Sequence, residues 1–181
     1  IITRKYADML RAYQDKLASL KFFDPACGSG NFLTETYICL RRLENEALNL
    51  LGGGTLDLFT GQQELSPVKV SISQFYGIEV NDFAVSVAKT ALWIAESQML
   101  DETARIVGHH IDFLPLKTYT NIREGNALRL DWNSVLPASE CSYIMGNPPF
   151  LGYSNQSKAQ KDDLISLYVD ERGKPYKSAG K

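Results

Sequence analysis

The sequence predicts a single α/β domain built on a parallel β-sheet. Three observations favour this class. Short apolar runs alternate along the chain with longer segments that have helical periodicity. Glycine or polar turns follow the apolar runs, and 181 residues with 44% apolar content are enough for one hydrophobic core. Right-handed crossovers between such strands make the sheet parallel.

The first part of the chain predicts two helices around a strand. Residues 6–20 carry apolar side chains at a spacing of three to four, as in a helix, and residues 21–24 form a short buried strand. Residues 31–51 repeat the helical spacing until three glycines, Gly52 to Gly54, end the helix. Residues 51–73 are interpreted as an insertion of turns and short pieces.

The second part continues the alternation of strands and helices. Residues 74–80 predict a strand, and Asn81 or Asp82 can cap the helix that follows. Four alanines share one side of this helix, which favours close packing on a sheet: Ala84, Ala88, Ala91 and Ala95. Residues 120–123 form a weak third strand and residues 141–145 a fourth. Ligands of such sheets bind at the carboxyl ends of the strands, so motifs that follow strands should share one site.

Composition limits the classes of function. With a net charge of −2, the sequence shows no basic face that would bind DNA phosphates. If DNA is the substrate, most of the affinity for it must come from sequence outside this chain. Cys27, Cys39 and Cys141 lack CxxC spacing and are expected to be buried free thiols. The pair at 109–110 has no ligand partners nearby, so no metal is expected. Without a signal peptide or a long apolar run, a cytoplasmic protein is expected.

A glycine turn follows the first strand. Gly28 and Gly30 leave room for a ligand to approach the backbone, although such turns are common. The dinucleotide motif requires glycine or alanine where this chain has Leu33. Asp24, at the head of the turn, suits the ammonium group of an amino acid better than a pyrophosphate. The turn therefore favours S-adenosylmethionine over NAD.

Two further motifs follow the second and third strands. Glu79 lies where a carboxylate can accept both hydroxyl protons of a ribose, although it could instead be a helix-capping or solvated residue. The insertion accounts for its long distance from the glycine turn. Asn126 could accept a hydrogen bond from the adenine amine of the cofactor, while the backbone around Ala127 meets a ring nitrogen. A plain turn explains this last motif equally well.

The most informative motif follows the fourth strand and consists of Asn147, Pro148, Pro149 and Phe150. The prolines fix the backbone and leave carbonyls free as acceptors. The Asn147 side-chain oxygen and the Pro148 carbonyl can accept the two protons of a planar amine, and Phe150 can stack on its ring. The same four residues alone could be only a rigid turn. Following a strand and three ordered motifs, they indicate methyl transfer to a planar amine.

These motifs resemble those of the γ-class N6-adenine DNA methyltransferases of restriction–modification systems, most closely the large single-chain type II enzymes that fuse methylase to nuclease. The similarity extends from about residue 15 to the end and implies a Rossmann-like class I methyltransferase fold, with a partial parallel sheet and flanking helices, acting on an adenine flipped out of double-stranded DNA. It implies cofactor contacts by Asp24, Pro25, Ala26, Gly28, Gly30, Glu79, Val80, Asn126 and Ala127, and target-base contacts by Asn147, Pro148, Pro149 and Phe150.

The chain departs from this family at three points. Asn126 stands where the family often has aspartate, so the charge at that contact is uncertain. The family's cofactor segment upstream of the first motif is missing, and its further strands and recognition domain would follow residue 181. Residues 1–181 are therefore expected to be the N-terminal, cofactor-binding part of a methyltransferase domain and inactive alone, with residues 151–181 beginning its DNA-facing region.

Two alternative functions remain open on the sequence. Methyltransferases of protein glutamine amides or RNA guanine amines share the Asn-Pro-Pro-aromatic loop, because their chemistry also requires that a planar amine be held. A non-catalytic cofactor-binding module is the third reading. The intact loop at Asn147 disfavours it, since such a module has no need to hold an amine.

Overall fold

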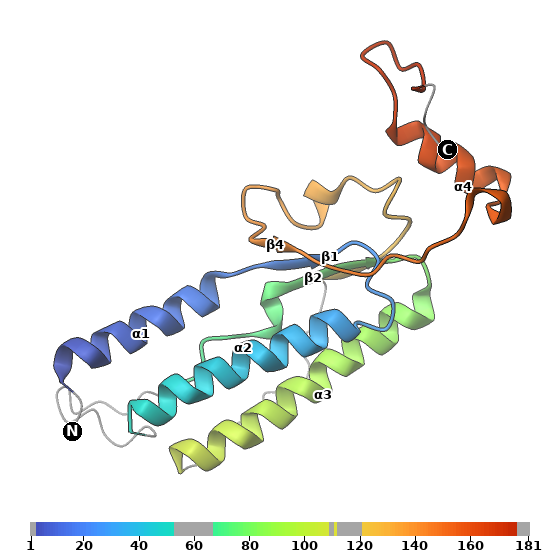
Figure 1. The fold of residues 1–181 in the computed structure, drawn as a ribbon. Coiled ribbons are helices and arrows are strands. Elements are labelled where there is room, and N and C mark those ends of the chain that lie inside the picture. The colour runs from blue at the N-terminus through green and yellow to red at the C-terminus, as the bar shows by residue number, and fades with distance from the viewer. Residues whose placement is uncertain (1–2, 53–66, 109–110, 112–120, 177–181) are drawn as a thin grey trace.

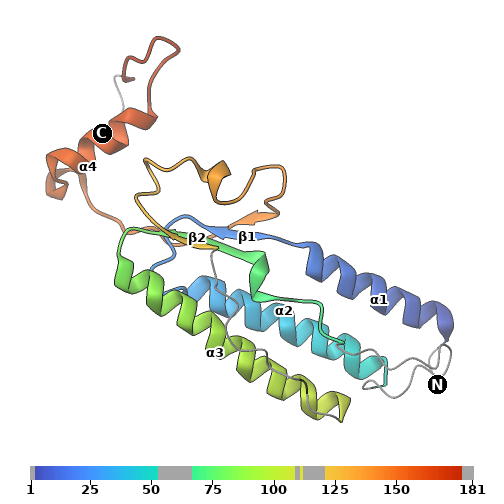
Figure 2. The same cartoon turned by 180° about the vertical axis from the view of Figure 1, so that it is seen from behind.

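The computed structural model describes residues 3–52, 67–108, 111 and 121–176. One sheet contains four parallel strands in the order β3-β2-β1-β4, namely β1 (Phe22–Asp24), β2 (Phe75–Glu79), β3 (Ile122–Glu124) and β4 (Tyr143–Ile144). Three long helices lie on one side of it, α1 (Arg4–Ser19), α2 (Asn31–Leu50) and α3 (Asp82–Val107), while α4 (Lys158–Leu167) stands apart from them (Figures 1 and 2). The α/β class and the parallel sheet predicted from the sequence are confirmed.

Most predicted elements are present, with ends shifted by one or two residues. The third strand is the main correction, because it begins at Ile122 and includes Glu124. Ile122 is in register with Gly77, and Glu124 with Glu79, so pairing with β2 sets its position. Of the predicted insertion at 51–73, residues 53–66 lie outside the described ranges. Its last residues enter a short 3₁₀ helix, Ile72–Gln74, which Ser71 caps.

The two faces of the sheet are covered by different segments. Phe22 and Phe75 point to the helical side, where their rings stack with centroids 5.2 Å apart. Phe23 and Ile78 point to the opposite side and pack with Leu136. This alternation follows from the two-residue repeat of a strand. Both central strands are therefore buried on two faces, as expected for a parallel sheet.

The ends and the buried face of α3 agree with the sequence. The Asn81 side-chain oxygen accepts a hydrogen bond from the backbone N–H of Ala84 at 3.0 Å, which confirms the predicted cap. Ala88 and Ala95 are buried against the core, whereas the alanines at 84 and 91 are only partly buried. Gly108, with a φ of 73°, ends the helix in a left-handed conformation.

The cysteines correct one prediction. All three are free thiols and Cys27 is buried, but Cys39 is exposed and Cys141 only partly buried. Cys39 lies on the solvent side of α2, between the core residues Tyr37 and Leu40, because helical periodicity turns it away from the core. The histidines at 109–110 lie outside the described residues. Within the described ranges, no group of acidic, cysteine or histidine side chains could hold a metal ion, and no helix is long and apolar enough to cross a membrane.

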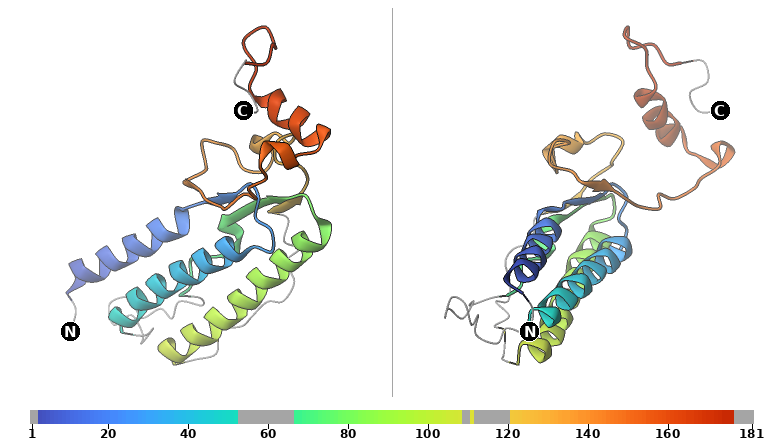
Figure 3. Two further views of the ribbon diagram at one scale, coloured as in Figure 1. Left: turned by 45° about the vertical axis from the view of Figure 1, so that its right-hand side comes forward. Right: turned by 60° about the vertical axis from the view of Figure 1, so that its left-hand side comes forward.

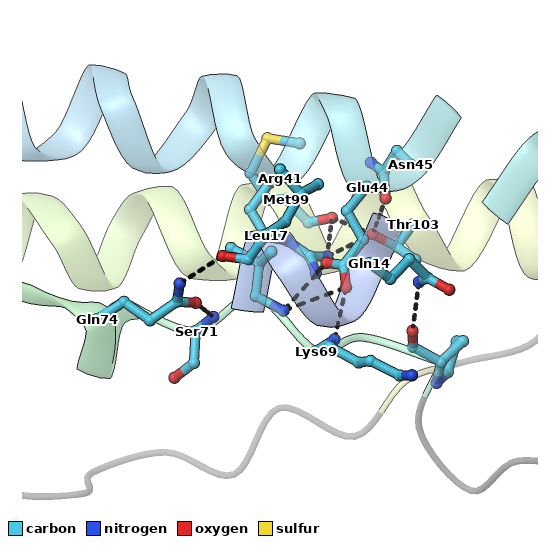
Figure 4. A network of polar contacts seen from close by, with 12 residues as sticks. Gln14, Leu17, Arg41, Glu44, Asn45, Lys69, Ser71, Gln74, Met99 and Thr103 are labelled. Atoms are coloured by element: carbon cyan, nitrogen blue, oxygen red, sulfur yellow. Dashed lines mark hydrogen bonds and ion pairs between the residues drawn. The ribbon is translucent and has the colours of Figure 1, made fainter. Parts of the chain in front are cut away.

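A buried polar network connects the segment that begins at residue 67 to the helices (Figure 4). Arg41 and Glu44 form an ion pair on α2 with no exposed side-chain area. The Glu44 carboxylate also accepts hydrogen bonds from the backbone N–H groups of Lys69 and Val70, at 2.6 and 3.1 Å. The Arg41 guanidinium donates to the Thr103 hydroxyl of α3 at 2.6 Å. The network therefore joins α2, α3 and the segment that leads into β2.

Candidate functional site

The predicted site residues gather at one edge of the sheet. Because all four strands are parallel, Asn126, Glu79, Asp24 and Asn147 follow strand ends in that spatial order, from β3 to β4. The chain leaves β1 through α2 toward β2 and β3 on one side, and returns to β4 on the other side (Figure 1). The junction of β1 and β4 is therefore a topological switch point, where open α/β sheets bind their ligands. Asp24 and Asn147 flank that junction.

The turn between β1 and α2 is held against the end of β2. Backbone N–H groups of Cys27 and Gly28 donate to the Ile78 carbonyl at 3.0 Å and to Glu79 Oε2 at 2.9 Å. The other oxygen of Glu79 accepts from the N–H of Asn81 at 2.9 Å. Glu79 thus links two turns, and its carboxylate retains lone pairs on the solvent side. Asn81, and not Glu79, caps α3, so the helix-capping interpretation of Glu79 is wrong, whereas a ligand contact is compatible with its hydrogen bonds.

The two glycines of the turn have different physical roles. Gly28 has a φ of 54°, and no atom lies within 4 Å of the place where a Cβ would stand. Gly30, with a φ of 82°, caps α2, and a Cβ there would lie 2.9 Å from the Cβ of Ala88 on α3. Gly28 fits the predicted open approach for a ligand. Gly30 is required by the contact between the two helices.

Asp24 lies at this edge in an environment that disfavours the charged form of its carboxyl group. Its side chain is 1% exposed, and Oδ1 accepts a hydrogen bond from the N–H of Ala26 at 3.0 Å. Burial raises the pKa of the Asp24 carboxyl above its ordinary value, the Ala26 bond opposes this rise, and the Glu79 carboxylate adds to it. No lysine or arginine pairs with Asp24 in the part of the chain that the structure describes. A positively charged group of a ligand could therefore pair with the Asp24 carboxylate.

Burial affects the neighbouring thiol in the same direction. It raises the pKa of Cys27 to about 12, with smaller contributions from the carboxylates of Asp24 and Glu79. The thiolate is the nucleophilic form of cysteine, so Cys27 stays protonated and unreactive at neutral pH. Cys27 packs in the core beneath the turn.

The loop after β4 passes directly over Asp24. The N–H of Met145 donates to the carbonyl of Phe23 at 2.9 Å, which extends the strand pairing. Gly146 follows with a φ of 151°, and a Cβ there would lie 2.5 Å from Asp24 Oδ1. Sequence reasoning assigned no role to Gly146 and expected a buried strand before it, but Tyr143 and Ile144 of β4 are more than half exposed. Only glycine allows the chain to cross the carboxylate so closely.

The four residues that follow Gly146 are exposed. Asn147, Pro148 and Pro149 lie on the surface, and Phe150 is 93% exposed. An aromatic side chain so poorly packed contributes little to the core of the described residues. This loop and Asp24 meet at the switch point, one exposed and the other buried.

Asn126 has partners that the sequence did not indicate. Its side-chain oxygen accepts from the N–H of Leu128 at 2.9 Å, and its side-chain nitrogen donates to Asp163 of α4 at 2.8 Å. The carbonyl of the adjacent Ala127 accepts from the Trp132 indole at 2.8 Å. Beside Glu79, Val80 exposes most of its side chain. Asp163 is a further residue of this edge, and no local pattern could have revealed a contact formed across 37 positions.

The arrangement is a Rossmann-like methyltransferase fold, with the buried Asp24 and the exposed loop at Asn147 on either side of the switch point. The chain belongs to the family of MmeI DNA-methyltransferase domains, whose model matches residues 2–178. This agrees with the resemblance to DNA methyltransferases of restriction–modification systems that the motifs indicated.

Individual relatives support the family assignment. DNA methyltransferase A of Bacillus subtilis strain 168 is 47% identical over 156 residues, which are 84% of this chain and 17% of the relative. A putative type II restriction enzyme and methyltransferase of Methanocaldococcus jannaschii is 32% identical over 140 residues, 77% of this chain and 11% of the relative. The solved structure of MmeI, a type IIL restriction–modification enzyme in complex with DNA, matches with a TM-score of 0.78 and 41% identity, over 92% of this chain and 22% of MmeI.

Proposed function

We propose that this chain binds S-adenosylmethionine and carries the catalytic loop that transfers its methyl group to the N6 amine of adenine in DNA, within a restriction–modification enzyme. The observation that carries the proposal is the pairing of Asp24 and the loop at Gly146. A buried carboxylate, which has no cationic partner among the described residues, lies directly beneath a loop that offers exposed acceptors to an amine. The cofactor and the target would therefore meet at the switch point.

The residues present fit the proposed cofactor. Asp24 suits the cofactor's ammonium group, because an opposite charge relieves a buried carboxylate. Gly28 leaves space above the turn, and Glu79 can accept the ribose hydroxyls. Pro25, Ala26, Val80, Asn126 and Ala127 complete the proposed contacts. When bound, the cofactor supplies a methyl group on a positively charged sulfur.

The loop after β4 suits the methyl acceptor. Asn147 Oδ1 and the Pro148 carbonyl accept hydrogen bonds from the two N–H groups of the target amine, and Pro149 keeps the loop rigid. These bonds direct the nitrogen lone pair out of the ring plane. Phe150, exposed in the structure, stacks on the base that has been turned out of the duplex. The bound cofactor would supply the methyl group to the amine held by Asn147 and Pro148, its sulfur would keep the electron pair of the carbon–sulfur bond, and the amine would lose one proton to solvent.

DNA is favoured over the other planar amines. The matching family is one of DNA-methyltransferase domains, and MmeI was solved in complex with DNA. A protein glutamine amide or an RNA guanine amine would need the same hydrogen-bond acceptors from the loop at Asn147. The net charge of −2 implies that affinity for DNA phosphates comes mainly from other parts of the protein that carries this chain.

The test separates chemistry from cofactor binding. In the protein that carries this chain, Asn147→Ala should lower the single-turnover rate on DNA by about a hundredfold, as for single oxyanion-hole donors. The affinity for S-adenosylmethionine should change little. Phe150→Ala should weaken the hold on the flipped base, with stacking worth roughly 1–3 kcal/mol. Asn49→Ala and Tyr6→Ala, at exposed positions on α2 and α1, are the matched controls.

The same assay should include DNA, RNA and release-factor substrates with labelled cofactor. Label in N6-methyladenine of DNA supports the proposal. Label only in RNA or protein would assign the alternative substrates, and an Asn147→Ala protein with the parental rate would make the loop a structural turn.

A further inference from the structure

The helix that follows the catalytic loop touches the cofactor edge through one buried acid. α4 begins shortly after Phe150 and lies away from the three long helices in every view (Figure 3). Most of its side chains are exposed or partly buried, yet Asp163 is only 9% exposed. A buried carboxylate on an otherwise exposed helix requires specific partners.

Those partners lie in the turn after β3. Asp163 Oδ2 accepts a hydrogen bond from Asn126 Nδ2 at 2.8 Å, and Oδ1 accepts from Arg129 Nε at 2.7 Å. Because Asn126 Oδ1 accepts from the N–H of Leu128, the orientation of the amide is determined. Its nitrogen faces α4 and its oxygen faces the turn. Any contact that Asn126 makes with a ligand therefore depends on Asp163.

Asp163 is not needed to form the helix itself. Ser157 and Gln160 make a reciprocal capping box at the start of α4. The contact of Ser166 with residue 163 uses the backbone carbonyl and is independent of the carboxylate. The Arg129 ion pair also matters less than the amide bond, because the arginine side chain is 65% exposed and solvent screens it. What the carboxylate adds is the attachment of α4 to Asn126.

We propose that Asp163 is a positioning residue that couples the adenine end of the cofactor site to the target-base loop. This inference rests on the proposed function. Asp163 holds the Asn126 amide in one orientation and anchors the chain that follows Phe150 to the end of β3. It also explains how asparagine serves at position 126, since the carboxylate at this edge comes from α4.

A charge exchange tests the coupling in the protein that carries this chain. Asn126→Asp places two carboxylates in contact, and should weaken binding of S-adenosylmethionine about tenfold and slow single-turnover methylation of DNA. Adding Asp163→Asn restores a donor–acceptor pair with the roles exchanged, so affinity and rate should return to within about threefold of the parent. Asp163→Ala should lower both, whereas Asp163→Asn keeps an acceptor for Asn126 and should retain most of both.

Asp162→Asn is the matched control, because it removes the same charge from the exposed side of the same helix. Cofactor binding is measured by calorimetry and the rate in a single-turnover assay, with a thermal melt of every variant. The inference fails if the double variant is no better than Asn126→Asp, or if Asp163→Ala changes neither affinity nor rate. A parent that does not bind S-adenosylmethionine overturns both proposals, whereas a parent that methylates adenine but shows no coupling overturns only this one.

Discussion

Asp24→Asn should separate binding of the cofactor from stability of the fold. Asparagine has nearly the shape of aspartate, and its side-chain oxygen can still accept the hydrogen bond from Ala26. The turn should therefore survive. The change removes the negative charge and turns one carboxylate oxygen into an NH2 group. Asp24 is 1% exposed beneath Gly146 and has no cationic partner in the described part of the chain.

The expected loss of affinity follows from that burial. Hydrogen bonds to charged groups contribute about 1.5–3 kcal/mol, which is roughly a 10- to 150-fold change in the Kd of S-adenosylmethionine. Affinity should also depend on pH. Because burial raises the pKa of Asp24, the parent should lose affinity as pH falls through this raised pKa, since the protonated acid no longer attracts an ammonium group.

Stability should change in the opposite direction. A carboxyl whose pKa is higher in the folded than in the unfolded state binds its proton more tightly when folded, so its ionised form opposes folding at neutral pH. This penalty is present above the folded pKa and disappears as pH falls below it. Asparagine carries no charge, so the melting temperature of the variant at neutral pH should equal or exceed that of the parent.

Calorimetric titration with S-adenosylmethionine, repeated over a range of pH, and thermal melts measure the two effects. Asp101→Asn, on the exposed side of α3, controls for loss of one charge. An Asp24→Asn protein that binds the cofactor with parental affinity but melts several degrees lower would show that Asp24 is a structural residue, and the proposed ammonium contact would be wrong.

Three other substitutions test the framework of the site. Gly30→Ala should lower the free energy of unfolding by about 1–3 kcal/mol through its contact with Ala88, in addition to its left-handed backbone. Gly28→Ala should show only the backbone cost of about 1–2 kcal/mol, and urea titrations that rank the two equally would contradict the packing argument. Glu44→Ala leaves the fully buried Arg41 without its partner and should cost about 3–5 kcal/mol of stability. Cofactor affinity of the folded variant should be unchanged, because Glu44 lies about 20 Å along α2 from Gly30; a Kd weakened tenfold would show that the network reaches the site.

Local sequence patterns were sufficient to predict most of the fold. The buried strands at 22–24 and 75–79, the cap at Asn81 and the long helices each follow from periodicity and from residues next to one another in the chain. The edge strand β3 was less predictable, because Ile122 alone of its residues is buried and pairing with β2 determines its register. The exposed Cys39 was missed because the number and spacing of the cysteines, on which the prediction rested, do not show which face of the helix a residue occupies.

The candidate site was predictable only where each motif is local. The positions of Asp24, Glu79 and Asn147 follow from the rule that motifs after parallel strands share an edge. The close crossing of Gly146 over Asp24 joins two different strands, so it depends on the order of strands in space. The bond between Asn126 and Asp163 likewise depends on where α4 returns to the sheet. Such contacts are tertiary and have no signature within one segment.

The strand order has a consequence for how the protein forms during synthesis. The buried residues of the larger core cluster lie between Leu17 and Met99, with the exception of Ile122. Both outer strands come from later in the chain, as do Asn126 and Asn147. A chain emerging from the ribosome with its N-terminus first can therefore pack α2 and α3 against the central strand pair before those two residues are made. The scaffold is synthesised before the proposed catalytic loop at Asn147, so substitutions in that loop should not impede the earliest folding steps.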